Sequence, residues 1–252
     1  MDPRIAFCTS ALDRARELTQ TLAHNLEAVR GSPHFVALCD LGSNDGIADY
    51  VRNELLPYVS AGKLVYFRAN ERSDFHAAMA KNASHRLGLR HGATVLFNAD
   101  PEQFVTEVTI RRVAETFART RTGVVHECTP EAYETYAGRI AARAEDWEML
   151  GGYDEALGPF TREPYDFLFR CRAIGRTYVR FGSELPRPVR VDHFAILSTT
   201  KFKDLDREGL GPCISRLSTE NLRIMLRRPV RLSLRSQRPL AGVLNFREEI
   251  VL

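Results

Sequence analysis

Apolar residues form short runs along the first half of the chain, and stretches with the spacing of amphipathic helices separate them. The apolar runs occupy residues 5–9, 34–40, 63–68, 94–98 and 123–128. The helical patterns occupy residues 12–29, 46–59, 74–89 and 105–119. Nearly continuous apolar runs of this kind are typical of strands buried on both faces of a sheet. Because strands and helices alternate, the pattern predicts an α/β fold with a central, mostly parallel sheet flanked by helices.

The second half of the chain has a less regular pattern. Short helices are predicted at residues 143–150 and 164–174, strands at 177–181 and 189–194, and a further helix at 219–227. Charge is also unevenly distributed, since residues 187–252 hold 13 Lys/Arg against 7 Asp/Glu while the whole chain has a net charge of only +3. We therefore expect one main domain over residues 1–200 and a basic C-terminal extension over residues 201–252 that packs on or beside it.

The overall composition is that of an ordinary soluble globular protein, with 44% hydrophobic and 27% charged residues in a chain of 252. A chain of this length folds without disulfide or metal crosslinks. The five cysteines have no CxxC spacing, which indicates reduced thiols in a cytoplasmic protein rather than a disulfide framework or a zinc site. No apolar run approaches the ~18–20 residues of a membrane-spanning helix, and the first residues do not have the pattern of a signal peptide.

Arginine outnumbers lysine by 31 to 4. This bias fits a GC-rich bacterial genome better than a nucleic-acid-binding protein, which would be more basic overall and carry recognisable motifs. Six of the arginines lie in residues 223–238, interleaved with apolar residues, and this segment could make a weak peripheral contact with an anionic membrane. Because Pro229 interrupts any long amphipathic helix there, a solvated basic face is the alternative that we favour.

Polar residues follow four of the predicted strands, at the edge where open parallel sheets bind their ligands. These residues are Thr9 and Ser10, Asp40 to Gly46, Asn70 to Asp74, and Asn98 to Glu102. The sequence contains no GxGxxG after the first strand and no GxxxxGK[ST], so neither a Rossmann nicotinamide site nor a P-loop is supported. The candidate chemistry therefore lies with carboxylates, amides and hydroxyls at this edge.

Three segments, taken together, carry a family resemblance. They are VALCDLGSNDG (36–46), LFNADPE (96–102) and LGGYDEALGPFTREPYDFLFR (150–170). In this order and spacing they resemble the nucleotide-sugar-dependent glycosyltransferases of the GT-A fold, above all the family 2 enzymes and the related galactosyltransferases, over residues 4–195. The resemblance implies a GT-A fold and the transfer of a hexose from a nucleotide-sugar donor to a hydroxyl group of a glycan or small-molecule acceptor.

The resemblance implies that Asp40 contacts the nucleotide base of the donor, with Thr9 and Ser10 lining the same pocket. A carboxylate accepts the imide N–H of uracil, so a UDP-sugar is the donor that we expect. The alternative reading of Asp40 is an Asx turn that closes the loop after the strand.

Asn98 and Asp100 stand at the family's Asp-x-Asp motif, where a carboxylate at a strand end holds a divalent cation that bridges the donor phosphates. We expect Asp100 to bind the metal and Asn98 to contact the ribose. Lys81 stands where relatives often have arginine, so we expect it to reach the diphosphate. The alternatives are that Asp100 begins a helix before Pro101 and that Lys81 is an ordinary solvated lysine.

His193 follows the last predicted strand, at a point where several relatives have a third metal contact. An imidazole ligand favours Mn²⁺ over Mg²⁺, because Mg²⁺ prefers a shell made only of oxygen. The resemblance thus implies Mn²⁺, or Mg²⁺, as the cofactor. The alternative is a histidine whose hydrogen bonds are satisfied within the fold.

The expected general base is the point at which the sequence departs most from the family. Inverting relatives have an acidic pair whose second residue, an Asp, deprotonates the acceptor hydroxyl, and here that position holds Pro164. Glu163 and Asp166 are the nearest carboxylates, and we expect one of them to act as the base. The alternative is that both only complement the dipole of the helix that begins there.

Two other functions compete with this interpretation. A degenerate, non-catalytic module that binds nucleotide or glycan would explain Pro164. A sugar nucleotidyltransferase would share the sheet architecture, but it needs a glycine-rich basic loop after the first strand, and residues 8–16 contain no glycine.

Overall fold

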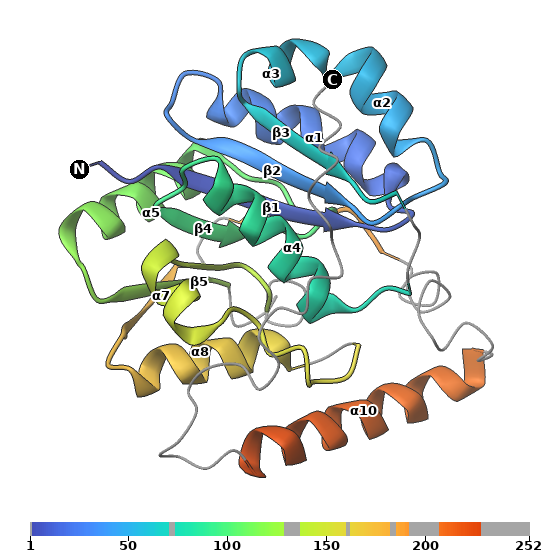
Figure 1. Ribbon diagram of the computed structural model, residues 1–252, viewed down its shortest axis with the longest axis vertical. Helices are drawn as coiled ribbons and strands as arrows, with labels where there is room; N and C mark the ends of the chain where they lie inside the picture. Colours follow the sequence, from blue (N-terminus) through green and yellow to red (C-terminus); the bar gives the residue numbers. More distant parts are fainter. Residues whose placement is uncertain are drawn as a thin grey trace.

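The computed structural model describes residues 2–70, 74–128, 137–159, 162–181, 185–191 and 207–227. At its centre lies a seven-stranded sheet with the strand order β3-β2-β1-β4-β6-β5-β7 (Figure 1). The strands are β1 (Ile5–Ala11), β2 (Phe35–Asp40), β3 (Leu64–Arg68), β4 (Val95–Asn98), β5 (Gly123–Glu127), β6 (Ile140–Arg143) and β7 (Thr177–Phe181). β6 runs antiparallel to both of its neighbours, and the other pairs are parallel. The predicted α/β fold with a mostly parallel sheet is confirmed.

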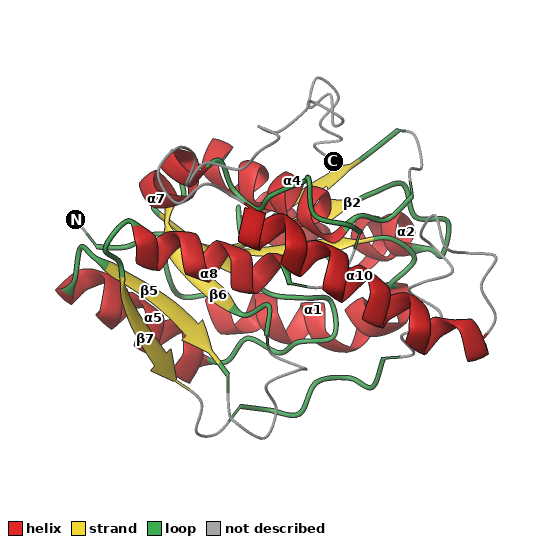
Figure 2. Ribbon diagram, turned by 90° about the horizontal axis from the view of Figure 1, so that it is seen from below, coloured by secondary structure: helices red, strands yellow, loops and turns green. Residues whose placement is uncertain are grey.

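Helices cover both faces of this sheet (Figures 1 and 2). They are α1 (Ala15–Val29), α2 (Ile47–Glu54), α3 (Leu56–Ser60), α4 (Ala77–Arg90), α5 (Glu107–Arg119), α7 (Ala144–Leu150), α8 (Glu163–Ala173) and α10 (Arg207–Arg227). Successive side chains of a strand point to opposite faces, so β1 contributes to two cores. Ile5 and Phe7 pack in the core of α1, α2 and α5, whereas Ala6 and Cys8 pack in the core of α4, α7 and α8.

The α4 face of the sheet is built from small residues, which lets this helix approach closely. A Cβ atom at Gly88 of α4 would lie 2.8 Å from the Cβ of Ala6 and 3.3 Å from the Sγ of Cys8. Only glycine therefore fits at this point of contact. The close approach matters for the site, because α4 carries Lys81 and brings it against the carboxyl edge of the sheet.

The local structure differs from the expected elements at three points. The helix expected at residues 46–59 is divided into α2 and α3, because Pro57 at the start of α3 has no N–H to continue the ladder. The strand β6 was not expected, since its four residues give too short a pattern to recognise. In the strand expected at residues 189–194, the part that the structure describes has no regular structure, and Val189 N donates to the carbonyl of Glu102 at 2.9 Å.

The last described element, α10, is longer than the helix expected at residues 219–227 and contains Pro212. In Figure 2 it lies next to α8, and hydrogen bonds join it to the loop before that helix. The division between residues 1–200 and 201–252 stays a prediction. None of the described helices has both the length and the apolar character that are needed to cross a bilayer.

Candidate active site

Four parallel strands end at one edge of the sheet, and the candidate residues follow them. Asp40, Arg68 and Asn98 are the last residues of β2, β3 and β4. Backbone bonds extend the pairing just beyond the strands, from Leu41 N to the carbonyl of Ala11 and from Ala69 N to the carbonyl of Asp40. The side chains after these strands therefore start from fixed backbone positions.

Asp40 is completely buried at this edge, with 0% of the residue exposed. Its Oδ1 accepts Ser43 N at 2.8 Å, and its Oδ2 accepts the Tyr66 hydroxyl at 2.9 Å and lies 3.5 Å from Nη1 of Arg68. Burial, followed by the charge of Asp40, raises the pKa of Tyr66. Asp40 thus closes the loop through Ser43 N, three residues on, whereas an Asx turn uses the N–H two residues on. A nucleotide base that bonds Asp40 would have to reach a buried carboxylate that already has these partners.

The loop after Asp40 is tied to the turn between β1 and α1. Asp13 has a φ of 53°, its N donates to Ser43 Oγ at 2.9 Å, and its Oδ1 accepts Asn44 N at 2.9 Å. Asp45 Oδ2 accepts Ala15 N at 2.6 Å. These hydrogen bonds hold the loop beside the end of β1, where Thr9 is buried and Ser10 is half-buried.

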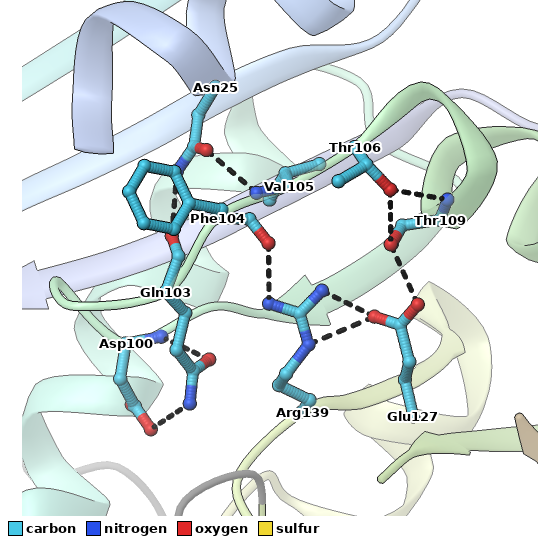
Figure 3. Close-up of polar contacts among 9 residues, drawn as sticks. All are labelled: Asn25, Asp100, Gln103, Phe104, Val105, Thr106, Thr109, Glu127 and Arg139. Atoms are coloured by element: carbon cyan, nitrogen blue, oxygen red, sulfur yellow. Dashed lines mark hydrogen bonds and ion pairs between the residues drawn. The ribbon is translucent and has the colours of Figure 1, made fainter. Parts of the chain in front are cut away.

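Asn98 and Asp100 lie together at the end of β4. Asp100 is half-buried, and its Oδ1 accepts Asn98 Nδ2 at 3.1 Å. Two hydrogen bonds join Asp100 to Gln103 (Figure 3). Asp100 N donates to Gln103 Oε1 at 3.0 Å, and Gln103 Nε2 donates to Asp100 Oδ2 at 3.3 Å. The helix-start alternative for Asp100 is wrong, because the next helix is α5, with Thr106 at its N-cap.

A buried polar network supports the segment that follows Asp100 (Figure 3). Arg139, 0% exposed, donates from Nη1 to the carbonyl of Phe104 at 3.0 Å and pairs with Glu127 through Nε at 2.9 Å and through Nη2. Glu127 in turn accepts the Thr109 hydroxyl at 2.7 Å. Because a buried charge is costly unless it is paired, this network ties β5 and the start of β6 to the loop after β4.

Gly138, which precedes Arg139, lies against the site. A Cβ atom at this glycine would lie 2.9 Å from Asp100 Oδ2, 3.2 Å from Asn98 Nδ2 and 3.4 Å from Lys81 Nζ. The carboxylate of Asp100, the amide of Asn98 and the ammonium of Lys81 therefore all lie close to the backbone of Gly138. No local pattern in the sequence points to this residue, because its partners come from β4 and α4 and the strand that follows it, β6, is too short to recognise.

Lys81 and Glu163 form a buried ion pair between α4 and α8. Lys81 Nζ lies 2.8 Å from Glu163 Oε1, and 5.7 Å from the centre of the Tyr153 ring. Burial disfavours the charged lysine, but the charges of Glu163 and Asp100 outweigh it and raise the pKa of Lys81. The alternative of a solvated lysine is wrong. Glu163 Oε2 is buried and accepts no hydrogen bond from the described residues.

Asp166 has different surroundings from Glu163. It is 0% exposed, and its Oδ2 accepts Arg170 Nε at 2.8 Å, one turn further along α8. Arg170 also donates to the carbonyls of Leu150 and Gly152, at 3.0 and 2.7 Å. This pair connects α8 to the end of α7. The structure thus brings Lys81, Asn98, Asp100 and Glu163 together, and directs Asp166 toward Arg170.

A divalent cation at this edge would depend on Asp100. No group of three or more His, Cys, Asp or Glu side chains within the described ranges could hold a metal ion, and His193 lies outside those ranges. Glu102 is paired with Arg14 at 2.8 Å; burial and the charge of Asp100 raise the pKa of Glu102. Mg²⁺-type sites often use one or two carboxylates plus substrate phosphates, and the single half-buried carboxylate of Asp100 at the strand end fits that mode.

Comparison with known proteins identifies the class of fold. No family model matches the chain, and no curated protein matches it. Solved structures do match. The mannosyltransferase PcManGT from Pyrobaculum calidifontis, in complex with GDP-Man and Mn²⁺, has a TM-score of 0.57 and 17% identity over 73% of this chain. S. aureus TarS (1–349) in complex with UDP has a TM-score of 0.59 and 10% identity over 87% of this chain.

A third match is GalNAc-T7 with UDP, GalNAc and Mn²⁺, with a TM-score of 0.57 and 14% identity over 71% of this chain. The chain spans 56% of the length of the mannosyltransferase, 70% of the TarS fragment and 42% of GalNAc-T7. The similarity to these structures confirms that the chain has the GT-A fold of nucleotide-sugar glycosyltransferases, as the sequence motifs predicted.

Proposed function

We propose that this protein is a glycosyltransferase that moves a hexose from a UDP-sugar to a hydroxyl group of a glycan or small-molecule acceptor, with a divalent cation as cofactor. One observation carries the proposal. At the carboxyl edge of a GT-A sheet, Lys81, Asn98 and Asp100 converge beside Gly138, and Lys81 also contacts Glu163. Within one site, the ammonium of Lys81 can pair with phosphate, the carboxylate of Asp100 can bind a divalent cation, and the carboxylate of Glu163 can accept a proton.

The donor would bind along the strand ends. Asp40, Thr9 and Ser10 would contact the nucleoside, and Asn98 the ribose. The three matched structures include two UDP complexes and one with GDP-Man, and the carboxylate of Asp40 suits uracil. Lys81 would move from Glu163 toward the diphosphate, where its ammonium pairs with phosphate oxygens.

The cofactor would be Mn²⁺, or Mg²⁺, held by Asp100 together with the donor phosphates. When bound, such an ion neutralises charge on the nucleoside diphosphate. Two of the matched structures contain Mn²⁺. His193 stays a predicted further ligand.

Glu163 is the proposed general base in a single displacement. The acceptor oxygen forms a bond to the anomeric carbon, its proton passes to Glu163, and the bond between the anomeric carbon and the phosphate oxygen breaks. Glu163 is preferred to Asp166 because its Oε2 accepts no hydrogen bond from the described residues, whereas Asp166 is paired with Arg170. Proton abstraction by a positioned side chain typically contributes about 10²–10⁴-fold.

A screen of nucleotide sugars by thermal shift, with Mn²⁺, Mg²⁺ or EDTA, tests donor binding. A ligand that binds only the folded state raises stability by RT ln(1 + [L]/Kd), so we expect one UDP-sugar to stand out, and only with metal. Release of UDP in the presence of hydroxyl acceptors then tests turnover. Donor binding without turnover would favour the alternative of a non-catalytic binding module, which would explain Pro164 at the position of the usual base. If no nucleotide sugar stabilised the protein, the proposal would be contradicted. Cytoplasmic location, bacterial origin and the membrane contact of residues 223–238 stay predictions.

A further inference from the structure

The helix α10 packs against the loop that precedes α8. Cys213, Leu217 and Asn221, spaced four residues apart, are buried, whereas Arg216 and Glu220 on the same helix are exposed. Gly158 of the loop makes room for this packing, since a Cβ atom there would lie 3.2 Å from both Leu217 Cδ2 and Asn221 Oδ1. One face of α10 is therefore fitted to this loop.

Two sets of hydrogen bonds fasten the loop to α10. Asn221 Oδ1 accepts Gly158 N at 2.6 Å, and Arg162 Nε donates to both the carbonyl and the hydroxyl of Ser218, each at 2.9 Å. Asn221 is 1% exposed, so its bond is made in a site where a lost partner would be costly. The contacts at Gly158 and Arg162 hold both ends of the segment that leads into α8.

Arg162 has an unusual backbone conformation at the point where α8 begins. Its φ is 66°, and within the described ranges only Asp13 is another non-glycine residue with a positive φ. The left-handed conformation is unfavourable for a residue with a Cβ, and the Arg162 side chain makes no capping hydrogen bond to α8. The turn is instead supported by Ser218, and the residue that the turn directs into the site is Glu163.

The same loop also contacts the start of α4. His76 Nε2 donates to the carbonyl of Leu157 at 2.9 Å, and Ala77 N donates to the carbonyl of Pro159 at 2.8 Å. The loop thus contacts the first turns of both helices that supply the buried ion pair, α4 with Lys81 and α8 with Glu163.

We propose that Arg162, anchored by α10, is a positioning residue that aims Glu163 at Lys81 and at the acceptor. This inference rests on the proposed function for the role of Glu163. It assigns to α10, which the sequence placed in an accessory extension, a part in the geometry of the site. A misplacement of a reacting group by about 1 Å can cost about 10²-fold in rate, so a contact remote from the reacting atoms can govern turnover.

The test uses Arg162→Gly, because glycine keeps the left-handed backbone accessible while removing the anchor. Asn221→Ala removes the second contact, Arg162→Lys is the conservative variant, and Arg216→Ala on the exposed face of α10 is the matched control. Two readouts are measured on the full chain. The first is kcat and donor KM for UDP release, in the wild-type and Glu163→Gln backgrounds. The second is the acetylation rate of Lys81 by acetic anhydride, followed by mass spectrometry.

We expect Arg162→Gly to lower kcat at least 10-fold with donor KM within 2-fold, and to change kcat less than 2-fold in the Glu163→Gln background. This loss of additivity is the mark of a residue that acts through Glu163. Lys81 should be acetylated several-fold faster in Arg162→Gly and Asn221→Ala but not in Arg216→Ala, and Arg162→Lys should restore part of both readouts.

Equal kcat losses in both backgrounds, or unchanged kcat and unchanged acetylation in folded Arg162→Gly, would overturn the inference. If wild-type protein released no UDP from any donor while Lys81 became reactive as expected, the proposed function would fail and the positioning of the ion pair by Arg162 would stand.

Discussion

Lys81 Nζ lies 2.8 Å from Glu163 Oε1, although the two residues are 82 positions apart in the chain. The pair joins α4 to the first residue of α8, and almost no water reaches it, since the two side chains are 9% and 7% exposed. The charge of Asp100 acts on the same lysine. Lys81 is therefore the group that connects the proposed metal and diphosphate side of the site with the proposed base.

The first prediction concerns the stability of this pair. Lys81→Met leaves the Glu163 carboxylate buried without a partner, and breaking a buried pair typically costs about 3–5 kcal/mol. We expect the Lys81→Met/Glu163→Gln double variant to recover more than half of that loss in urea unfolding. Arg52→Met, which removes the exposed Arg52–Asp49 pair, is the control and should cost about 1 kcal/mol or less. A double variant no more stable than Lys81→Met would contradict the prediction.

The second prediction concerns the metal. Asp100→Asn keeps the shape of the side chain and removes the carboxylate, so we expect it to abolish the part of donor-induced thermal stabilisation that requires Mn²⁺. In EDTA we expect the donor to stabilise neither the wild type nor Asp100→Asn. Asp49→Asn, on the exposed face of α2, should behave like wild type. Undiminished Mn²⁺ dependence in folded Asp100→Asn would remove Asp100 from the metal site.

The third prediction uses the close approach of Gly138 to the site. In Gly138→Ala the new methyl group would lie 2.9 Å from Asp100 Oδ2, closer than van der Waals contact allows, so it would displace the carboxylate that we propose holds the cation. We expect donor affinity to fall at least 10-fold, measured by calorimetry. Gly31→Ala is the matched control, because a Cβ atom at Gly31 meets nothing within 4 Å. Equal donor affinity in both variants would show that donor binding does not depend on where Gly138 lets the Asp100 carboxylate lie.

The strand ends of the site could be predicted from the sequence, and its long-range contacts could not. Asp40, Asn98 and Asp100 follow apolar runs, and the ends of parallel strands must meet at one edge. Gly138 could not be found, because the antiparallel β6 that presents it was too short to recognise. Nor does any local pattern reveal that Lys81 meets Glu163.

Other contacts of the structure do have a signal in the sequence. Asp166 and Arg170 are four residues apart on a predicted helix, the spacing of an ion pair on one helical face, and the structure forms that pair. Leu217 and Asn221 have the same spacing in α10. These periodicities indicate packing faces, but they do not say which loop packs against them.

The fourth prediction is a pH dependence of stability. Burial lowers the pKa of His85, to about 3 in the fold from a usual value of 6.5. Below pH 6.5 the unfolded state binds a proton at His85 that the folded state does not, so stability falls as the pH drops toward 3. Between pH 6.5 and 5 the loss from this residue is about 2 kcal/mol. His85→Gln should lose less stability over that range than wild type, whereas His24→Gln, on the exposed side of α1, should follow wild type.

The last prediction separates the two candidate bases. Glu163→Gln preserves shape and removes the proton acceptor, so we expect kcat to fall about 10²–10⁴-fold while donor affinity stays within a few-fold. Asp166→Asn should act differently, because it breaks the buried pair with Arg170 that also holds the carbonyls of Leu150 and Gly152. We expect it to lower the free energy of unfolding by about 3–5 kcal/mol and to leave kcat, per folded molecule, within about 10-fold.

Steady-state kinetics and urea unfolding on both variants provide the comparison. If turnover were lost only in folded Asp166→Asn, the base would be Asp166. If both variants kept wild-type turnover, the proton acceptor would lie elsewhere, and a mechanism without a base on α8 would follow.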